Sequence, residues 1–138
     1  MSGAPDRRGV PAFPPVLAGV LDLACLSTFV AFGGRRHEDL NEGMSWYLEV
    51  LWPIVLGWFV VALVTRLYTR ANGGGMWLAL LGTLVGGLVI TQLLRGSLQD
   101  RPWIGIFTLV AFGFIGLTAF GWRLVGLGYR KLRPASAA

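Results

Sequence analysis

Charged residues are scarce in this chain. Only 14% of its 138 residues are Asp, Glu, Lys or Arg, whereas soluble globular domains carry about 25%. Hydrophobic residues make up 54% of the chain and fall in four long runs that charged clusters separate. This distribution argues against an ordinary soluble domain and a disordered chain, and it is typical of an integral membrane protein.

Cysteine and histidine are almost absent. The single Cys25 cannot form an intramolecular disulfide, and no cysteine-based zinc or iron–sulfur site fits within one chain. The single His37 argues against a haem held by two histidines of this chain. The sequence also lacks a Walker A loop, a GxSxG elbow, an HExxH motif and a paired acidic metal motif. An enzyme is therefore unsupported, and we expect no cofactor and no metal.

The apolar runs predict an all-α integral membrane bundle of four transmembrane helices. They cover about residues 16–32, 46–68, 76–94 and 103–125, and each can cross a hydrocarbon layer of about 30 Å. In that layer every backbone group must be satisfied within its own segment, which favours helices. We expect a disordered lead over residues 1–15, a transmembrane domain over 16–129 and a basic, frayed tail over 130–138.

Lys and Arg are unequally divided between the two ends of the predicted bundle. With four spans, both termini and the middle loop share one side. That side carries Arg7, Arg8, Arg66, Arg70, Arg123, Arg130, Lys131 and Arg133, whereas the other carries Arg35, Arg36, Arg95 and Arg101. The positive-inside rule then predicts a multi-pass protein of the cell membrane with both termini in the cytoplasm. Anionic headgroups of the lipid bilayer account for the net charge of +5, so no nucleic-acid partner is needed.

Asp22 is the most informative position, because an ionisable group within a span is costly and marks a candidate functional site. It falls about six residues into the first run, or about 9 Å along a helix. One interpretation is a proton- or cation-binding carboxylate. The other is an ion pair with Arg123 or Arg66, which are expected at a similar depth in the fourth and second spans. Such a pair would hold the bundle together.

Pro53 lies inside the second predicted span. Its ring removes a hydrogen bond from the helix, so the Glu49 carbonyl loses its usual donor and a kink is expected. The kink would be flanked by Trp52 and Gly57. It is either a gate or an ordinary packing bend, and neither interpretation identifies a ligand.

The third span contains closely spaced small residues. Gly82 and Gly86 have GxxxG spacing, and Thr83, Gly87, Thr91 and Arg95 follow one another at four-residue steps. Such a ridge favours close helix packing, with the arginine reaching towards the outer surface. A pore-lining strip is the alternative interpretation.

A dense charged cluster ends the first span. Arg35, Arg36 and His37 precede Glu38 and Asp39. The histidine could titrate near neutral pH, although histidines in exposed loops are mostly bystanders.

Four short motifs occur in an order that resembles a known family. They are Asp22 in the first span, Gly34-Arg35-Arg36-His37 at its end, Trp52-Pro53 with Gly57, and a closing Gly121-Trp122-Arg123. The chain resembles the small four-helix membrane proteins catalogued as domain of unknown function three-zero-five-four. The family carries a small residue between the second arginine and the histidine, which is missing here. The resemblance implies the fold and the choice of sites, and no activity.

Two functional hypotheses follow. The first is a structural or accessory membrane component that forms a homo-oligomer or joins a larger membrane complex. The second is a proton- or cation-coupled small-solute transporter that uses Asp22. They differ in whether the Asp22 carboxylate is permanently paired or free to exchange its proton for a substrate.

Overall fold

The computed structural model describes residues 11–36, 43–100 and 105–133. Within these residues it contains four α-helices and a short 3₁₀ helix: α1 (Pro15–Arg36), α2 (Gly43–Val64), η2 (Leu67–Thr69), α3 (Gly74–Leu98) and α4 (Ile106–Leu132). Each α-helix is long and apolar enough to cross a membrane. The predicted fold class, an all-α bundle of four membrane-spanning helices, is confirmed.

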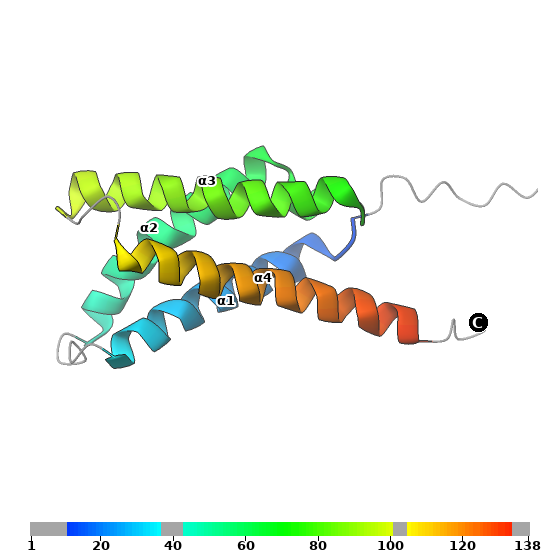
Figure 1. The fold of residues 1–138 in the computed structure, drawn as a ribbon, viewed down its shortest axis with the longest axis horizontal. Coiled ribbons are helices and arrows are strands. Elements are labelled where there is room, and N and C mark those ends of the chain that lie inside the picture. Colours follow the sequence, from blue (N-terminus) through cyan, green and yellow to red (C-terminus); the bar gives the residue numbers. More distant parts are fainter. Residues whose placement is uncertain (1–10, 37–42, 101–104, 134–138) are drawn as a thin grey trace, which may run out of the picture.

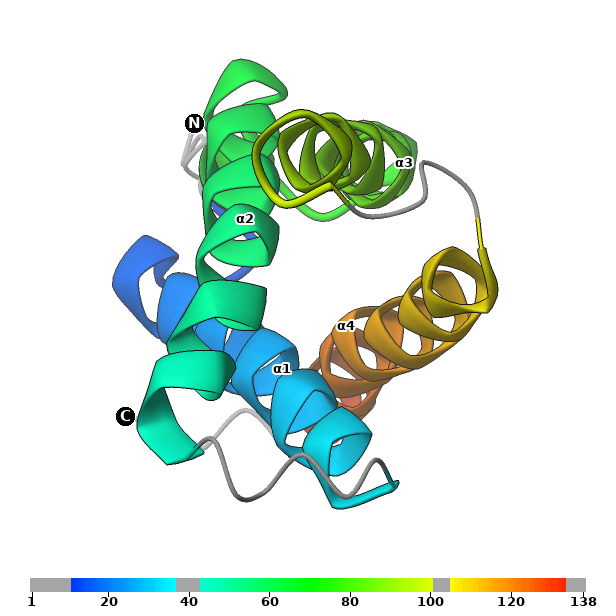
Figure 2. The same cartoon turned by 90° about the vertical axis from the view of Figure 1, so that its left-hand side faces the viewer.

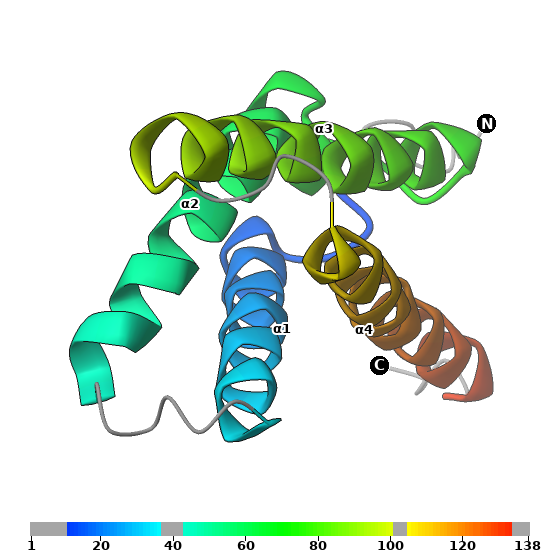
Figure 3. The ribbon, with the colours of Figure 1, turned by 60° about the vertical axis from the view of Figure 1, so that its left-hand side comes forward.

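The helices form a ring (Figure 2). Within the described residues α1 packs beside α2, α2 beside α3, α3 beside α4 and α4 beside α1, whereas the backbones of the diagonal pairs do not approach one another closely. The α2–α3 contact is the most extensive. Seen from a third direction, α1 lies between α2 and α4 (Figure 3). This order brings the first and last helices of the chain side by side.

Apolar side chains cover the outside of the ring as well as its interior. Large ones that are at least two-thirds exposed occur on every helix, among them Val16, Leu63, Val64, Leu78, Ile106, Leu109, Leu117 and Val125. Water would oppose this exposure, whereas lipid tails tolerate it. The outer surface therefore fits a bilayer.

Several predicted boundaries need correction. The second helix ends at Val64 rather than at residue 68, because the chain turns at Arg66 in the left-handed backbone region (φ 55°). The fourth helix continues to Leu132, so the start of the predicted frayed tail is helical.

The predicted disordered lead is wrong over its last residues. Ala12 and Phe13 are buried, and the Ala12 amide donates a 3.0 Å hydrogen bond to the Arg70 carbonyl. Arg130 of α4 donates to the Ala12 carbonyl. These contacts fold the segment before α1 against the end of the bundle.

Candidate functional site

The Asp22 carboxylate is fully buried in the bundle and forms an ion pair with Arg123 of α4. Nη1 of Arg123 donates to Oδ1 at 2.8 Å, and Nη2 donates to Oδ2 at 2.8 Å. The arginine side chain is 2% exposed and the aspartate 0%. A buried pair needs good geometry and further hydrogen bonds to offset the desolvation of both charges, and this bidentate arrangement provides the first of these.

Two aromatic donors complete the coordination of the carboxylate. The Tyr68 hydroxyl donates to Oδ2 at 2.9 Å, and the Trp122 indole donates to Oδ1 at 3.0 Å. Trp58 of α2 in turn donates to the Tyr68 oxygen at 3.1 Å. We call Asp22, Trp58, Tyr68, Trp122 and Arg123 the Asp22 cluster. Each carboxylate oxygen accepts two hydrogen bonds, which matches the roughly four acceptor positions of an ionised carboxylate.

The cluster joins every part of the ring except α3. Asp22 comes from α1, Trp58 from α2, Tyr68 from η2, and Trp122 with Arg123 from α4. The Arg123 guanidinium lies over the Trp122 ring, 4.2 Å from its centroid, and its Nη1 also donates to the Ala119 carbonyl at 3.1 Å. Consecutive residues of one helix thus reach the same carboxylate.

Arg66 does not take part in the pair, and that prediction is corrected. It is exposed and lies in the turn beyond the end of α2, where its backbone adopts left-handed geometry. The turn instead brings Tyr68 back towards the bundle. The neutral Tyr68 hydroxyl thus contacts the carboxylate for which Arg66 was the alternative partner.

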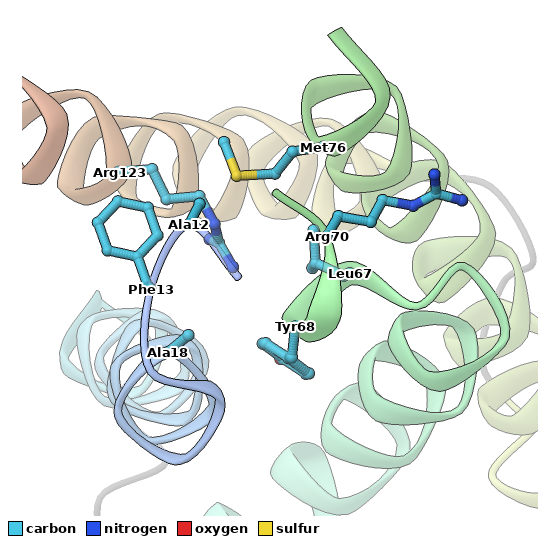
Figure 4. Close-up of a pocket in the computed structure, with 8 residues that line it drawn as sticks. All are labelled: Ala12, Phe13, Ala18, Leu67, Tyr68, Arg70, Met76 and Arg123. Atoms are coloured by element: carbon cyan, nitrogen blue, oxygen red, sulfur yellow. The ribbon is translucent and has the colours of Figure 1, made fainter. Parts of the chain in front are cut away.

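The end of the bundle around the cluster is closely packed. A cavity of only about 10 Å³ separates Arg123 of α4 from Tyr68 of η2, and Phe13 and Ala18 cover another side (Figure 4). That volume is at most the room that one water molecule needs. Phe13 also packs edge-on against Trp122, with ring centroids 4.9 Å apart. The carboxylate is thus enclosed by the segment before α1 and by η2.

Burial, and secondarily the charge of Asp22, raises the pKa of Tyr68 above its ordinary value. The hydroxyl therefore stays protonated and donates throughout the physiological pH range. The pKa of Tyr68 is higher in the folded state than in the unfolded chain. The stability that the protonated Tyr68 hydroxyl contributes is therefore complete below about pH 10 and is lost as pH rises further.

Replacing Tyr68 with Phe is expected to lower the free energy of unfolding by about 1–2 kcal/mol, because the bond to Asp22 is lost and Trp58 loses its acceptor. Thermal unfolding in detergent between pH 7 and pH 11 measures this effect. The gap between the wild type and Tyr68→Phe should be constant up to about pH 10 and narrow above it. A gap that widens in alkali would contradict the assigned role of the hydroxyl.

Pro53 and Gly57 lie where α2 packs on α3. α2 runs through Pro53 without interruption, and the Glu49 carbonyl accepts a 2.9 Å hydrogen bond from the Gln99 side chain. Thr91 of α3 donates to the Pro53 carbonyl at 3.3 Å. Side chains of α3 and of its C-cap thus donate hydrogen bonds to the carbonyls of Glu49 and Pro53. This favours the interpretation of an ordinary packing bend over a gate. Trp52 lies on the exposed surface of α2.

The small residues of α3 face α2. A Cβ on Gly57 would lie 2.5 Å from the Gly87 carbonyl oxygen, and one on Gly86 would lie 3.1 Å from Val61. Gly82 is exposed and has Thr65 as its neighbour across the contact, 3.8 Å from the position of a Cβ. The ridge therefore supports packing between two helices of one chain. We call the contact of Gly57, Gly87 and Thr91 the α2–α3 seam.

The remaining members of the ridge are buried. The Thr83 hydroxyl donates to the Ala79 carbonyl at 2.7 Å, which leaves it to accept the 2.9 Å hydrogen bond from the Thr65 hydroxyl. Arg95 does not reach outwards as expected. Its guanidinium lies within the bundle, 3.9 Å from the centroid of the Phe107 ring, because the ring offers a cation a favourable face.

The charged cluster predicted after the first span is only partly described. The backbone of Arg35 and Arg36 forms the end of α1, while His37 lies outside the described residues. Among the described residues, no group of three His, Cys, Asp or Glu side chains could hold a metal ion.

Tyr68, Trp122 and Trp58 are the cluster members that sequence reasoning missed. The sequence singled out Trp122 only as part of the closing Gly121-Trp122-Arg123 motif, and Tyr68 only as the end of the second predicted span. The available signal was that Tyr68 and Trp122 lie at the same end of the predicted bundle as Asp22. Each ring carries a hydrogen-bond donor that a buried carboxylate can pair with.

Comparison with known proteins adds one relationship. Residues 19–126 match the family described as "Protein of unknown function (DUF3054)". This range includes α1 from its first turns, η2 and the Trp122-Arg123 pair of α4. No curated protein and no solved structure shows a significant match to the chain.

Proposed function

The chain belongs to this DUF3054 family of unknown function, and from that premise we propose that it is a structural or accessory component of a membrane assembly. The observation that carries the proposal is the saturation of Asp22 by four hydrogen bonds from Arg123, Tyr68 and Trp122. A carboxylate held in this way fastens helices to one another. Its role is to fix the shape of the bundle that a partner meets.

The same observation weighs against the transporter hypothesis. A coupling carboxylate must release its proton and receive a substrate in turn, so it needs access and an open acceptor position. Asp22 is 0% exposed and its neighbouring cavity has about 10 Å³. Burial and a bidentate arginine support a permanent pair.

The outer faces of the bundle are the surfaces that such a component offers. The glycines of the α2–α3 seam already pack two helices of the same chain together. A second copy or another protein would therefore pack on the exposed apolar faces. Leu78 on α3 and Leu117 on α4 are more than two-thirds exposed. Lateral contacts between such faces in a bilayer depend on close packing.

Native mass spectrometry of the protein extracted gently from its own membrane tests the proposal. We expect a homo-oligomer or a larger assembly to survive extraction. A chain that is monomeric under all mild conditions would contradict an accessory role. In that case reconstituted vesicles with an imposed proton gradient would compare flux through the wild type and Asp22→Asn, and loss of flux in a folded variant would establish the transporter.

The proposed orientation, with both termini in the cytoplasm, has its own test. In a Cys25→Ala background, a membrane-impermeant thiol reagent applied to intact cells should label a cysteine placed at Asn41 and not one at Asn72. Asn41 lies between α1 and α2, and Asn72 lies between η2 and α3. The opposite labelling pattern would reverse the orientation. Labelling of both positions after the membrane is permeabilised is the control.

A further inference from the structure

A groove runs between the first turns of α1 and the last turns of α4, next to the Asp22 cluster, with which it shares Trp122. Its volume is about 730 Å³, within the range of sites that hold small organic molecules. The part nearest the middle of the bundle is apolar and is formed by Leu17 and Leu21 of α1 with Val125 of α4. The other end is formed by Tyr129, Arg130 and Arg133.

One face of α4 supplies both parts of the groove. Trp122, Val125, Gly126 and Tyr129 line it, at spacings of three and four residues that place them on the same side of a helix. A Cβ on Gly126 would lie 2.9 Å from the Phe13 ring. The glycine therefore lets Phe13 close the groove over α4.

The two arginines are held at the mouth of the groove. Arg130 lies over the Phe13 ring at 4.8 Å and donates to the Ala12 carbonyl, while Arg133 lies over the Tyr129 ring at 5.1 Å. The bond from Arg130 to Ala12 uses one of the five N–H groups of a guanidinium. Both side chains are exposed, so further donors can meet a ligand.

The length of α4 places these arginines at the level of the lipid headgroups. Its 27 residues span about 40 Å, against a hydrocarbon layer of about 30 Å. The end that carries Arg130, Lys131 and Arg133 is the one expected to project, because charged side chains are costly within the hydrocarbon. Val125 and Arg133 are eight positions apart, so about 12 Å of helix separates the apolar part of the groove from its outermost charge.

We infer that this groove binds an anionic phospholipid, with an acyl chain along Leu17, Leu21 and Val125 and the phosphate against Arg130 and Arg133. The apolar floor and the cationic mouth follow one another in the order in which a phospholipid presents its tail and its headgroup. A bilayer supplies such a ligand beside the groove. The inference does not depend on the proposed accessory role, since a monomer would bind the lipid equally well.

Lipid titration of the full chain in detergent, followed by native mass spectrometry, tests the inference. Phosphatidylglycerol is compared with phosphatidylcholine of the same acyl chains. The wild type should bind one phosphatidylglycerol preferentially. The double variant Arg130→Gln and Arg133→Gln should bind it roughly 25-fold more weakly, because each cation near the headgroup contributes about fivefold.

A matched control removes two charges outside the groove. The double variant Arg66→Gln and Lys131→Gln should bind phosphatidylglycerol within about twofold of the wild type, because exposed charges away from the ligand are screened. Val125→Trp fills the apolar floor while both groove arginines remain, and it should also weaken binding. Unchanged thermal unfolding midpoints show that all variants are folded.

Four results would overturn the inference. The first is equal binding of the two lipids by the wild type. The second is unchanged binding after loss of Arg130 and Arg133, or after Val125→Trp. The third is displacement of the lipid by glycerol phosphate at equal concentration, which would indicate a site for free anions. The fourth is a homodimer that Val125→Trp dissociates, which would show that the groove binds a second copy.

Discussion

Replacing Asp22 with Asn is expected to lower the free energy of unfolding by about 3–5 kcal/mol, because Arg123 remains charged and buried without a counter-ion. The amide also presents a donor where three side chains already donate. Unfolding of the purified protein in mixed detergent micelles, followed by tryptophan fluorescence, measures the change.

Two matched variants show whether the effect comes from the lost pair. Asp100→Asn makes the same chemical change at an exposed position with φ 50°, which asparagine tolerates, and it should leave stability within about 0.5 kcal/mol. Adding Arg123→Gln to Asp22→Asn should recover part of the loss, because no uncompensated charge is left. Strict additivity of the two single changes would show that the pair contributes no coupling.

Gly57→Ala is expected to destabilise the bundle by about 1–3 kcal/mol through overpacking of the α2–α3 seam. The new Cβ would lie 2.5 Å from the Gly87 carbonyl oxygen and 2.8 Å from the Thr91 hydroxyl. A backbone oxygen cannot rotate away as a flexible side chain can. The two helices must therefore separate, and the hydrogen bond from Thr91 to the Pro53 carbonyl is strained with them. Thermal unfolding in detergent reports the loss.

Gly113→Ala is the control for this change and should have the opposite sign. A Cβ on Gly113 of α4 has no neighbour within 4 Å, so the substitution adds helix propensity of up to about 1 kcal/mol without a clash. If both alanines destabilised the protein equally, the cost would arise from glycine loss in general. The seam would then have no special requirement for close approach.

The sequence was sufficient to predict the four helices, because the length of each hydrophobic run indicates a membrane span directly. It was insufficient to predict where the helices end. Nothing in the apolar run from Trp46 to Tyr68 shows that the helix stops at Val64, since the left-handed turn at Arg66 involves neither glycine nor proline. The burial of Phe13 was equally hidden, because it depends on Gly126 and Trp122, far along the chain.

The same limit applies to the candidate site. The sequence identified Asp22 as an ionisable group within a span and named Arg123 or Arg66 as its partner, with Arg123 favoured. The choice depends on helix rotation and on ring order, and neither follows from hydropathy. The ring puts α4 beside α1 and the turn after α2 directs Arg66 outwards. Tyr68, two residues after Arg66, donates a hydrogen bond to the carboxylate instead.

The long sequence separation of Asp22 and Arg123 bears on how the protein is made. A ribosome delivers Asp22 to the membrane about a hundred residues before Arg123, so the nascent chain holds an uncompensated carboxylate until its final helix arrives. Tyr68 provides an earlier, neutral donor once η2 has emerged. Truncated chains that lack α4 should therefore resemble unassembled subunits and be degraded, which makes arrival of the last helix the step that completes biogenesis.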